Sequence, residues 1–216
     1  IMDELKRLKK DWQESQKFPK LSQFEIYKFL QKKSSSLVKR IFVLSLIEFG
    51  FWTFISFFIK DNEAQQRFDQ YQMEHFTIPL IVIGYAVLLY FFFLFYKNYK
   101  SISSIDSTKG LMQQILKTRR TVKNYVIFNL VFLYVSIVIG LLIELNNNPD
   151  VVMLTAKFNS SGDYLIFYGI IIILTLIMMA LLTALLLGFY FLVYGILLKK
   201  LKNNYKELQT IEADTD

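Results

Sequence analysis

The chain has 216 residues, of which 54% are hydrophobic and 17% aromatic, and its formal net charge is +7. It has no cysteine, which excludes disulfides, thiolate metal sites and a cysteine nucleophile. Residues 165–198 include neither a charged side chain nor a proline. This stretch exceeds the roughly 20 residues that a helix needs to cross the hydrocarbon core, and a chain of this length can rarely bury such a helix on every side. The composition therefore predicts an integral membrane protein.

Residues 1–40 are predicted to form a cytoplasmic amphipathic helical segment. They hold 11 Lys/Arg and 5 Asp/Glu and lack a secretory pattern, so the apolar stretch that begins at Ile41 should remain as an anchor. Ser22 and Glu25 have the spacing of a capping box, which predicts a helix start. Two interpretations stay open: a helix lying among anionic headgroups, or a helical hairpin that docks a cytoplasmic protein. In the second, aromatic side chains would be the anchors, namely Trp12, Phe18 and Tyr27.

Four charge-poor stretches predict four transmembrane helices. Besides 165–198, they are 41–59, 78–96 and 125–143. Three alternate segments hold 22 of the 25 basic residues: 1–40, 97–124 and 199–216. By the positive-inside rule, these three segments and both termini are predicted to be cytoplasmic. The expected fold class is all-α, with a four-span membrane domain (41–198) and helical extensions on the cytoplasmic side. Because topology and anionic headgroups account for the dispersed basic residues, nucleic-acid binding is not expected.

Glu48 is the only Asp, Glu, Lys or Arg within the predicted spans. It follows Arg40 by eight residues, which places it about 12 Å deep in a core of about 30 Å. An acidic side chain there costs roughly 2.5–3.5 kcal/mol on insertion scales, so it should face the bundle and have a partner. Its stripe of helix surface also carries Ser45, Trp52 and Ser56.

Asn129 and Ser136 are the expected partner surface for Glu48, because they share a face of the third span. Ser136 is the closer of the two in depth. Glu48 is either a proton- or ion-responsive site or a neutral carboxyl that joins helices by hydrogen bonds. No second charged side chain within the spans is available for a relay.

The segment 97–124 is predicted to be a cytoplasmic helical connection. Asp106 or Ser107 can cap a new helix, and no proline intervenes before Tyr125, so this helix should continue directly into the third span. Its basic side chains lie largely off its apolar stripe. Two of them, Arg119 and Arg120, are candidate partner-binding residues.

The last predicted span should also continue into the cytoplasm. An apolar stripe extends the pattern to about Thr210, and an acidic tail completes the segment 199–216. At roughly 1.5 Å per residue, 165–198 is about 51 Å long, which favours one tilted helix over two short ones. Since each cytoplasmic extension has an apolar stripe, the three extensions should pack together or present a joint surface.

Several short stretches resemble an uncharacterised family of bacterial four-span inner-membrane proteins. They are Leu8-Lys9-Lys10-Asp11-Trp12, Phe18-Pro19-Lys20, Glu25-Ile26-Tyr27, Lys33-Ser34-Ser35-Ser36 and Leu116-Lys117-Thr118-Arg119-Arg120-Thr121-Val122-Lys123. The resemblance covers most of the chain and implies the bacterial inner membrane, with no established activity. Some members bear carotenoid-oxygenase labels, but that chemistry needs several histidines and this chain has only His75.

The sequence favours a non-catalytic membrane protein. No phosphate-binding loop, paired-histidine motif or serine elbow is present, and no metal or cofactor is expected. The first hypothesis is a regulator, tether or complex subunit that binds a cytoplasmic protein, or a second copy of itself, through its basic helices. The alternative is a small transporter or channel subunit that uses Glu48.

Overall fold

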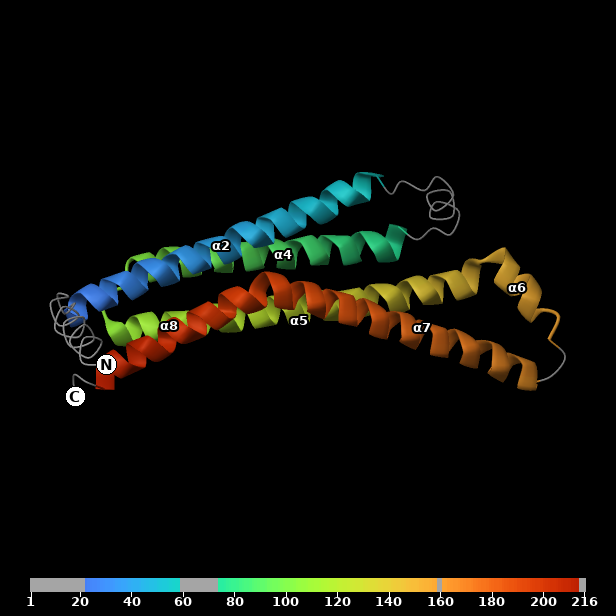
Figure 1. The fold of residues 1–216 in the computed structure, drawn as a ribbon. Coiled ribbons are helices and arrows are strands. Elements are labelled where there is room, and N and C mark those ends of the chain that lie inside the picture. The colour runs from blue at the N-terminus through green and yellow to red at the C-terminus, as the bar shows by residue number, and fades with distance from the viewer. Residues whose placement is uncertain (1–21, 59–73, 159–160, 214–216) are drawn as a thin grey trace, which may run out of the picture.

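The computed structural model describes residues 22–58, 74–158 and 161–213, and these form an elongated bundle of long helices (Figure 1). No strand occurs in these ranges. The first hairpin consists of α2 (Gln23–Phe58) and α4 (Glu74–Ser103). The second half comprises α5 (Thr108–Asn147), the short α6 (Pro149–Thr155), α7 (Ser161–Tyr190), the π-helix η1 (Phe191–Gly195) and α8 (Ile196–Ala213).

The helix starts follow local sequence signals. The Ser22 hydroxyl accepts from the Glu25 amide at 3.2 Å, and the Glu25 carboxylate accepts from the Ser22 amide at 2.8 Å, which confirms the capping box. Of the two predicted caps at the next helix, Ser107 is the one used, since its side chain accepts from the Gly110 amide. The helix that starts there is continuous to Asn147, as predicted.

The chain from Ser161 to Ala213 is one helical run, which confirms a single helix across 165–198. The sequence did not predict the π-helical turn η1 that joins α7 to α8. No proline occurs there, and Gly195 ends the turn. Turns of this kind alter helical phase and occur frequently at functional sites.

The bundle divides into two halves along its length. In the closed half, α2 packs against α4 and α8, and α5 packs against the same two helices. All the buried hydrophobic side chains of the described residues lie here, within 27–41, 91–102, 111–125 and 190–208. In the open half the helices diverge, with α2 and α7 pointing away from each other (Figure 1). The hydrophobic core therefore occupies only one end of the molecule.

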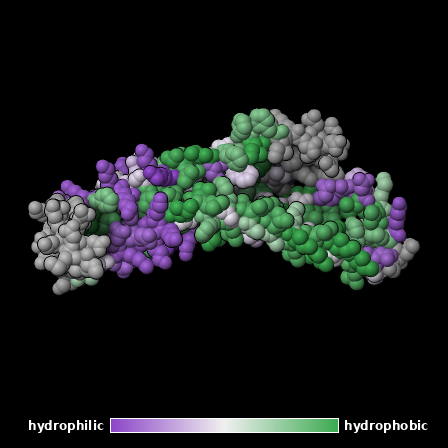
Figure 2. Space-filling view, viewed as in Figure 1, coloured by the Kyte–Doolittle hydropathy of each residue, from purple (hydrophilic) through white to green (hydrophobic). Residues whose placement is uncertain are grey.

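Apolar side chains cover most of the open half, whereas polar ones gather over the closed half and at the far end of the open half (Figure 2). Ile173 and Leu185 of α7, for example, are 58% and 63% exposed. Among the described residues, three helical stretches are long and apolar enough to cross a membrane: Thr77–Ser103, Thr108–Asn147 and Ser161–Ala213. An all-helical fold with these stretches is compatible with a helical membrane protein.

Candidate functional site

Glu48 lies on α2 at the point where the closed half gives way to the open half. Its side chain is only 7% exposed. Tyr194 donates a hydrogen bond to Glu48 Oε2 at 2.7 Å, and Tyr125 donates to the same oxygen at 3.1 Å. The carboxyl group therefore joins α2 to α5 and η1. The expectation that Glu48 faces the bundle and has partners is confirmed, because an acidic group without them would be expensive to bury.

Three tyrosines surround this carboxyl group. The ring centroids of Tyr125 lie 6.2 Å from those of Tyr190 and 6.1 Å from those of Tyr194. Tyr190 and Tyr194 are themselves 5.8 Å apart, on either side of the start of η1. Tyr190 and Tyr194 are one helical turn apart, and with the π turn between them both point toward Glu48.

A cavity of about 330 Å³ adjoins Glu48. Its lining comes from α2, α4, α5 and α7, and includes Phe49, Trp52, Leu88, Asn129, Phe132, Ser136 and Tyr190. A second cavity of about 290 Å³ lies beside it, between α2, α4 and α5. The two cavities share Phe49, Trp52, Leu88, Asn129 and Phe132 as lining, so they are adjacent, and we call the pair the slot.

Gly84 on α4 leaves room for the Phe132 ring, which forms part of the wall of the slot. A Cβ atom at this position would lie 2.6 Å from the Phe132 ring, so only glycine allows this ring to approach the α4 backbone so closely. Gly84 and Phe132 both line the second cavity. The width of the slot therefore depends on a contact between α4 and α5.

The predicted partners of Glu48 need correction. The Asn129 amide donates to the Tyr125 carbonyl at 3.1 Å, and the Ser136 hydroxyl donates to the Phe132 carbonyl at 2.8 Å. Both residues line the Glu48 cavity, but the hydrogen bonds to the carboxyl group come from tyrosines. The sequence did not predict this pairing, because it depends on how α5 packs against α2.

The other members of the predicted polar stripe have different surroundings. Ser45 is buried, and its hydroxyl donates to the Phe42 carbonyl of its own helix at 2.7 Å. Trp52 lines both cavities and is 50% exposed. The side chain of Ser56 is outside the described part of the structure. Of the two whose side chains are described, Ser45 and Trp52, only Trp52 lines the cavity.

The closed half contains buried amides that connect its helices. Asn98 of α4 donates to the Thr121 hydroxyl at 3.1 Å and accepts from the Gln114 side chain at 3.1 Å, both on α5. Asn204 of α8 donates to the Ser34 hydroxyl of α2 at 3.0 Å. The described parts of the segments 1–40, 97–124 and 199–216 pack together, as expected, and polar contacts join their helices.

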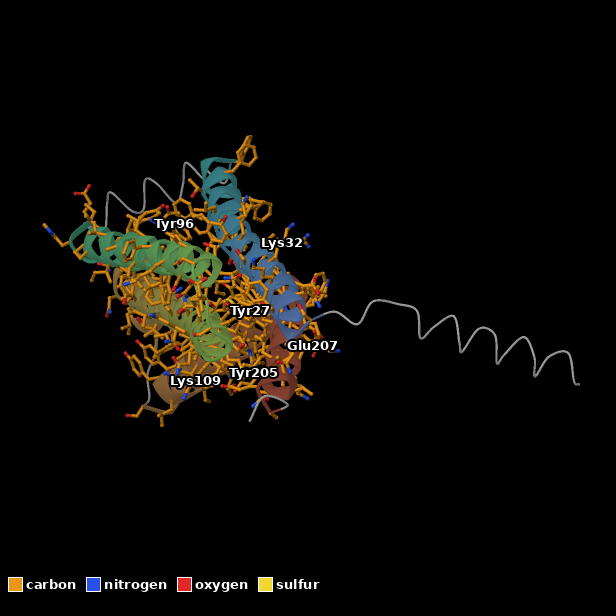
Figure 3. All side chains as sticks on the ribbon, turned by 90° about the vertical axis from the view of Figure 1, so that its left-hand side faces the viewer. Tyr27, Lys32, Tyr96, Lys109, Tyr205 and Glu207 are labelled. Atoms are coloured by element: carbon orange, nitrogen blue, oxygen red, sulfur yellow. The ribbon has the colours of Figure 1, made fainter. Side chains whose placement is uncertain are left out.

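Tyr27 is part of this packing. It is 7% exposed, and its hydroxyl donates to the Ile105 carbonyl at 2.5 Å. Burial raises the pKa of the Tyr27 hydroxyl, and the charge of Asp106 adds to the rise. Figure 3 views this end of the bundle, with Tyr27 among the helices and Lys32 at the outer side of α2. Tyr27 therefore joins α2 to the α4–α5 turn and is not an accessible anchor for a partner.

The remaining candidate partner-binding residues differ in exposure, and two of them are not described by the structure. Arg120 is exposed, whereas Arg119 is half-buried and its Nε has no hydrogen-bond partner among the described residues. Trp12 and Phe18 lie outside the described residues. The accessible basic surface of the closed half also includes Lys32, Lys109, Lys117 and Lys202.

The fold is all-helical and compatible with a membrane protein. Its candidate site is a cavity at Glu48, where the closed half gives way to the open half. A family model described as "Domain of unknown function (DUF8845)" matches residues 24–213, so the chain belongs to this family. No curated protein and no solved structure matches the chain.

Proposed function

We propose that the chain crosses the bacterial inner membrane four times, with both termini and the polar end of the closed half in the cytoplasm. This requires α2 to be a span in addition to the three stretches named above. At 36 residues α2 is about 54 Å long, and Glu48 is the only charged residue between 41 and 58. The basic residues of the closed half support this orientation.

We further propose that the protein is a non-catalytic regulator, tether or complex subunit whose closed half binds a cytoplasmic partner. The supporting observation is that four helices fold at this end of the bundle into one unit with its own core and buried amides. A helix that served only as an anchor would need no such packing beyond the bilayer. The exposed basic side chains suit a partner with an acidic surface.

Crosslinking in intact membranes followed by affinity purification tests this proposal. We expect a specific protein partner, and a fall in its yield of about tenfold when Lys117 and Arg120 are both replaced by glutamate. Lys157, which is beyond α6 at the other end of the molecule, provides the control: Lys157→Glu should leave the yield unchanged. Recovery of lipid alone, of a second copy of the chain, or of equal yields from both variants would contradict the proposal.

The second candidate is a small transporter or channel subunit that uses Glu48. The observation in its favour is that a cavity reaches this carboxyl group between the helices. Flux in proteoliposomes that depends on pH and is abolished by Glu48→Gln would support it. Absence of flux in the unmodified protein, or equal flux in the variant, would refute it.

A further inference from the structure

The Glu48 carboxyl group has no positively charged neighbour in its cavity. Among the described residues that line the cavity, Glu48 is the only charged one, and its hydrogen-bond donors are neutral phenol hydroxyls. These donors orient the carboxyl group but carry no compensating charge. An ionised carboxylate held in an apolar setting is strongly favoured by a positive charge placed next to it.

The walls of the cavity suit an organic cation. Aromatic rings line it on several sides, contributed by Phe49, Trp52, Tyr125, Phe132 and Tyr190. The faces of such rings attract cations, and the attraction increases when water is excluded. By contrast, an anion would lie against the carboxylate, and a metal ion would find only one acidic ligand here.

The slot also has room for an apolar body attached to the charged group. Besides the cavity at Glu48, it includes the adjacent cavity of about 290 Å³, where Ile81, Gly84, Tyr85 and Phe128 join the lining. Both cavities lie at the start of the open half, whose exposed surface is apolar. A ligand that dissolves in the bilayer can therefore reach the slot from the side.

We propose that the slot beginning at Glu48 is a binding site for a lipophilic organic cation, with its positive centre at the carboxylate and its apolar part between Trp52 and Phe132. This inference names a ligand for the proposed transporter or channel function. Movement of the ligand across the membrane rests on that function. Binding itself needs no transport, so the two are measured separately.

Trp52 provides a direct signal, because the chain has only two tryptophans and the other is Trp12. In a Trp12→Phe background, the fluorescence of the full chain in lipid nanodiscs reports on the slot. The probe is tetraphenylphosphonium, and tetraphenylborate is a control of similar size and opposite charge. We expect saturable quenching by the cation and none by the anion.

Glu48→Gln in the same background keeps the shape of the side chain and removes its charge. We expect the dissociation constant for the cation to rise at least tenfold, with thermal unfolding checked so that loss of fold is recognised. Glu144→Gln removes an acidic group farther along α5 and should leave binding unchanged. Tyr194→Phe should have a smaller effect and raise the dissociation constant about threefold, because it removes one of the donors that orient the carboxyl group.

Equal quenching by the cation and the anion, or equal cation affinity in the Glu48→Gln and Glu144→Gln variants, would overturn the inference. Saturable binding without flux in proteoliposomes would support the site and refute the transport function. Flux of protons that tetraphenylphosphonium does not compete with, together with no saturable binding, would refute the site while leaving the transport function intact.

Discussion

The two halves of the bundle are built from the same helices but are stabilised differently. In the closed half, buried leucines and isoleucines surround hydrogen-bonded amides such as Asn98 and Asn204. In the open half, the side chains of α7 are largely exposed and the helices diverge. Water drives apolar side chains together, but lipid does not. The contrast indicates that tertiary stability is concentrated in the closed half.

The largest expected difference is between two leucines of one helical run. Leu201 is fully buried, whereas Leu185 is 63% exposed. Leu201→Ala should lower the free energy of unfolding by about 2–5 kcal/mol, because it leaves a cavity in a packed core. Leu185→Ala should change it by less than about 0.5 kcal/mol. Unfolding in detergent, followed by circular dichroism, measures both, and equal losses would contradict the proposed division.

The buried amides offer the next test. Asn98→Ala leaves the Gln114 side chain without its acceptor and removes the donor to Thr121, which should cost about 1–3 kcal/mol. Asn146→Ala is the control, since the Asn146 side chain is exposed and donates only to the Leu142 carbonyl of its own helix. A loss of stability no larger than the control's would mean that the amide cluster adds little to the closed half.

Two glycines should respond in opposite directions. Gly84→Ala places a methyl group against the Phe132 ring and should destabilise the protein by about 1 kcal/mol. Gly50→Ala meets nothing within 4 Å and should stabilise α2 by roughly 0.5–1 kcal/mol, because alanine is the better helix former. Thermal unfolding compares them. Stabilisation by Gly84→Ala would show that Phe132 is free to move and that the slot is wider.

The smallest effect concerns the capping box of α2. The hydrogen bonds from the Ser22 backbone and side chain lower the pKa of Glu25 below its ordinary value. A lowered pKa in the folded state gives stability that is present above the ordinary pKa and disappears as the pH falls through the lowered one. Protection of the Ser22 amide against hydrogen exchange should therefore decrease below about pH 4. In a Glu25→Gln variant, protection should no longer depend on this titration.

The candidate site was only partly predictable. Glu48 stood out because a single carboxyl group in an apolar span must find partners, and the cavity does include the predicted Trp52, Asn129 and Ser136. Tyr194 gave no signal, since η1 changes the helical phase without a proline to mark it. Tyr27 was misjudged as an exposed aromatic, because its carbonyl partner lies in a turn 78 residues away in the chain.

The sequence by itself determined the helical class, the membrane character and the start of α2, because these depend on local composition and on hydrogen bonds within a few residues. Helix continuity through 107–147 and across 165–198 also followed from the absence of prolines and turns. Only the tertiary structure decided which side chains meet Glu48, where the bundle opens and which amides pair. Those contacts depend on tilt and rotation of whole helices, which packing between distant segments sets.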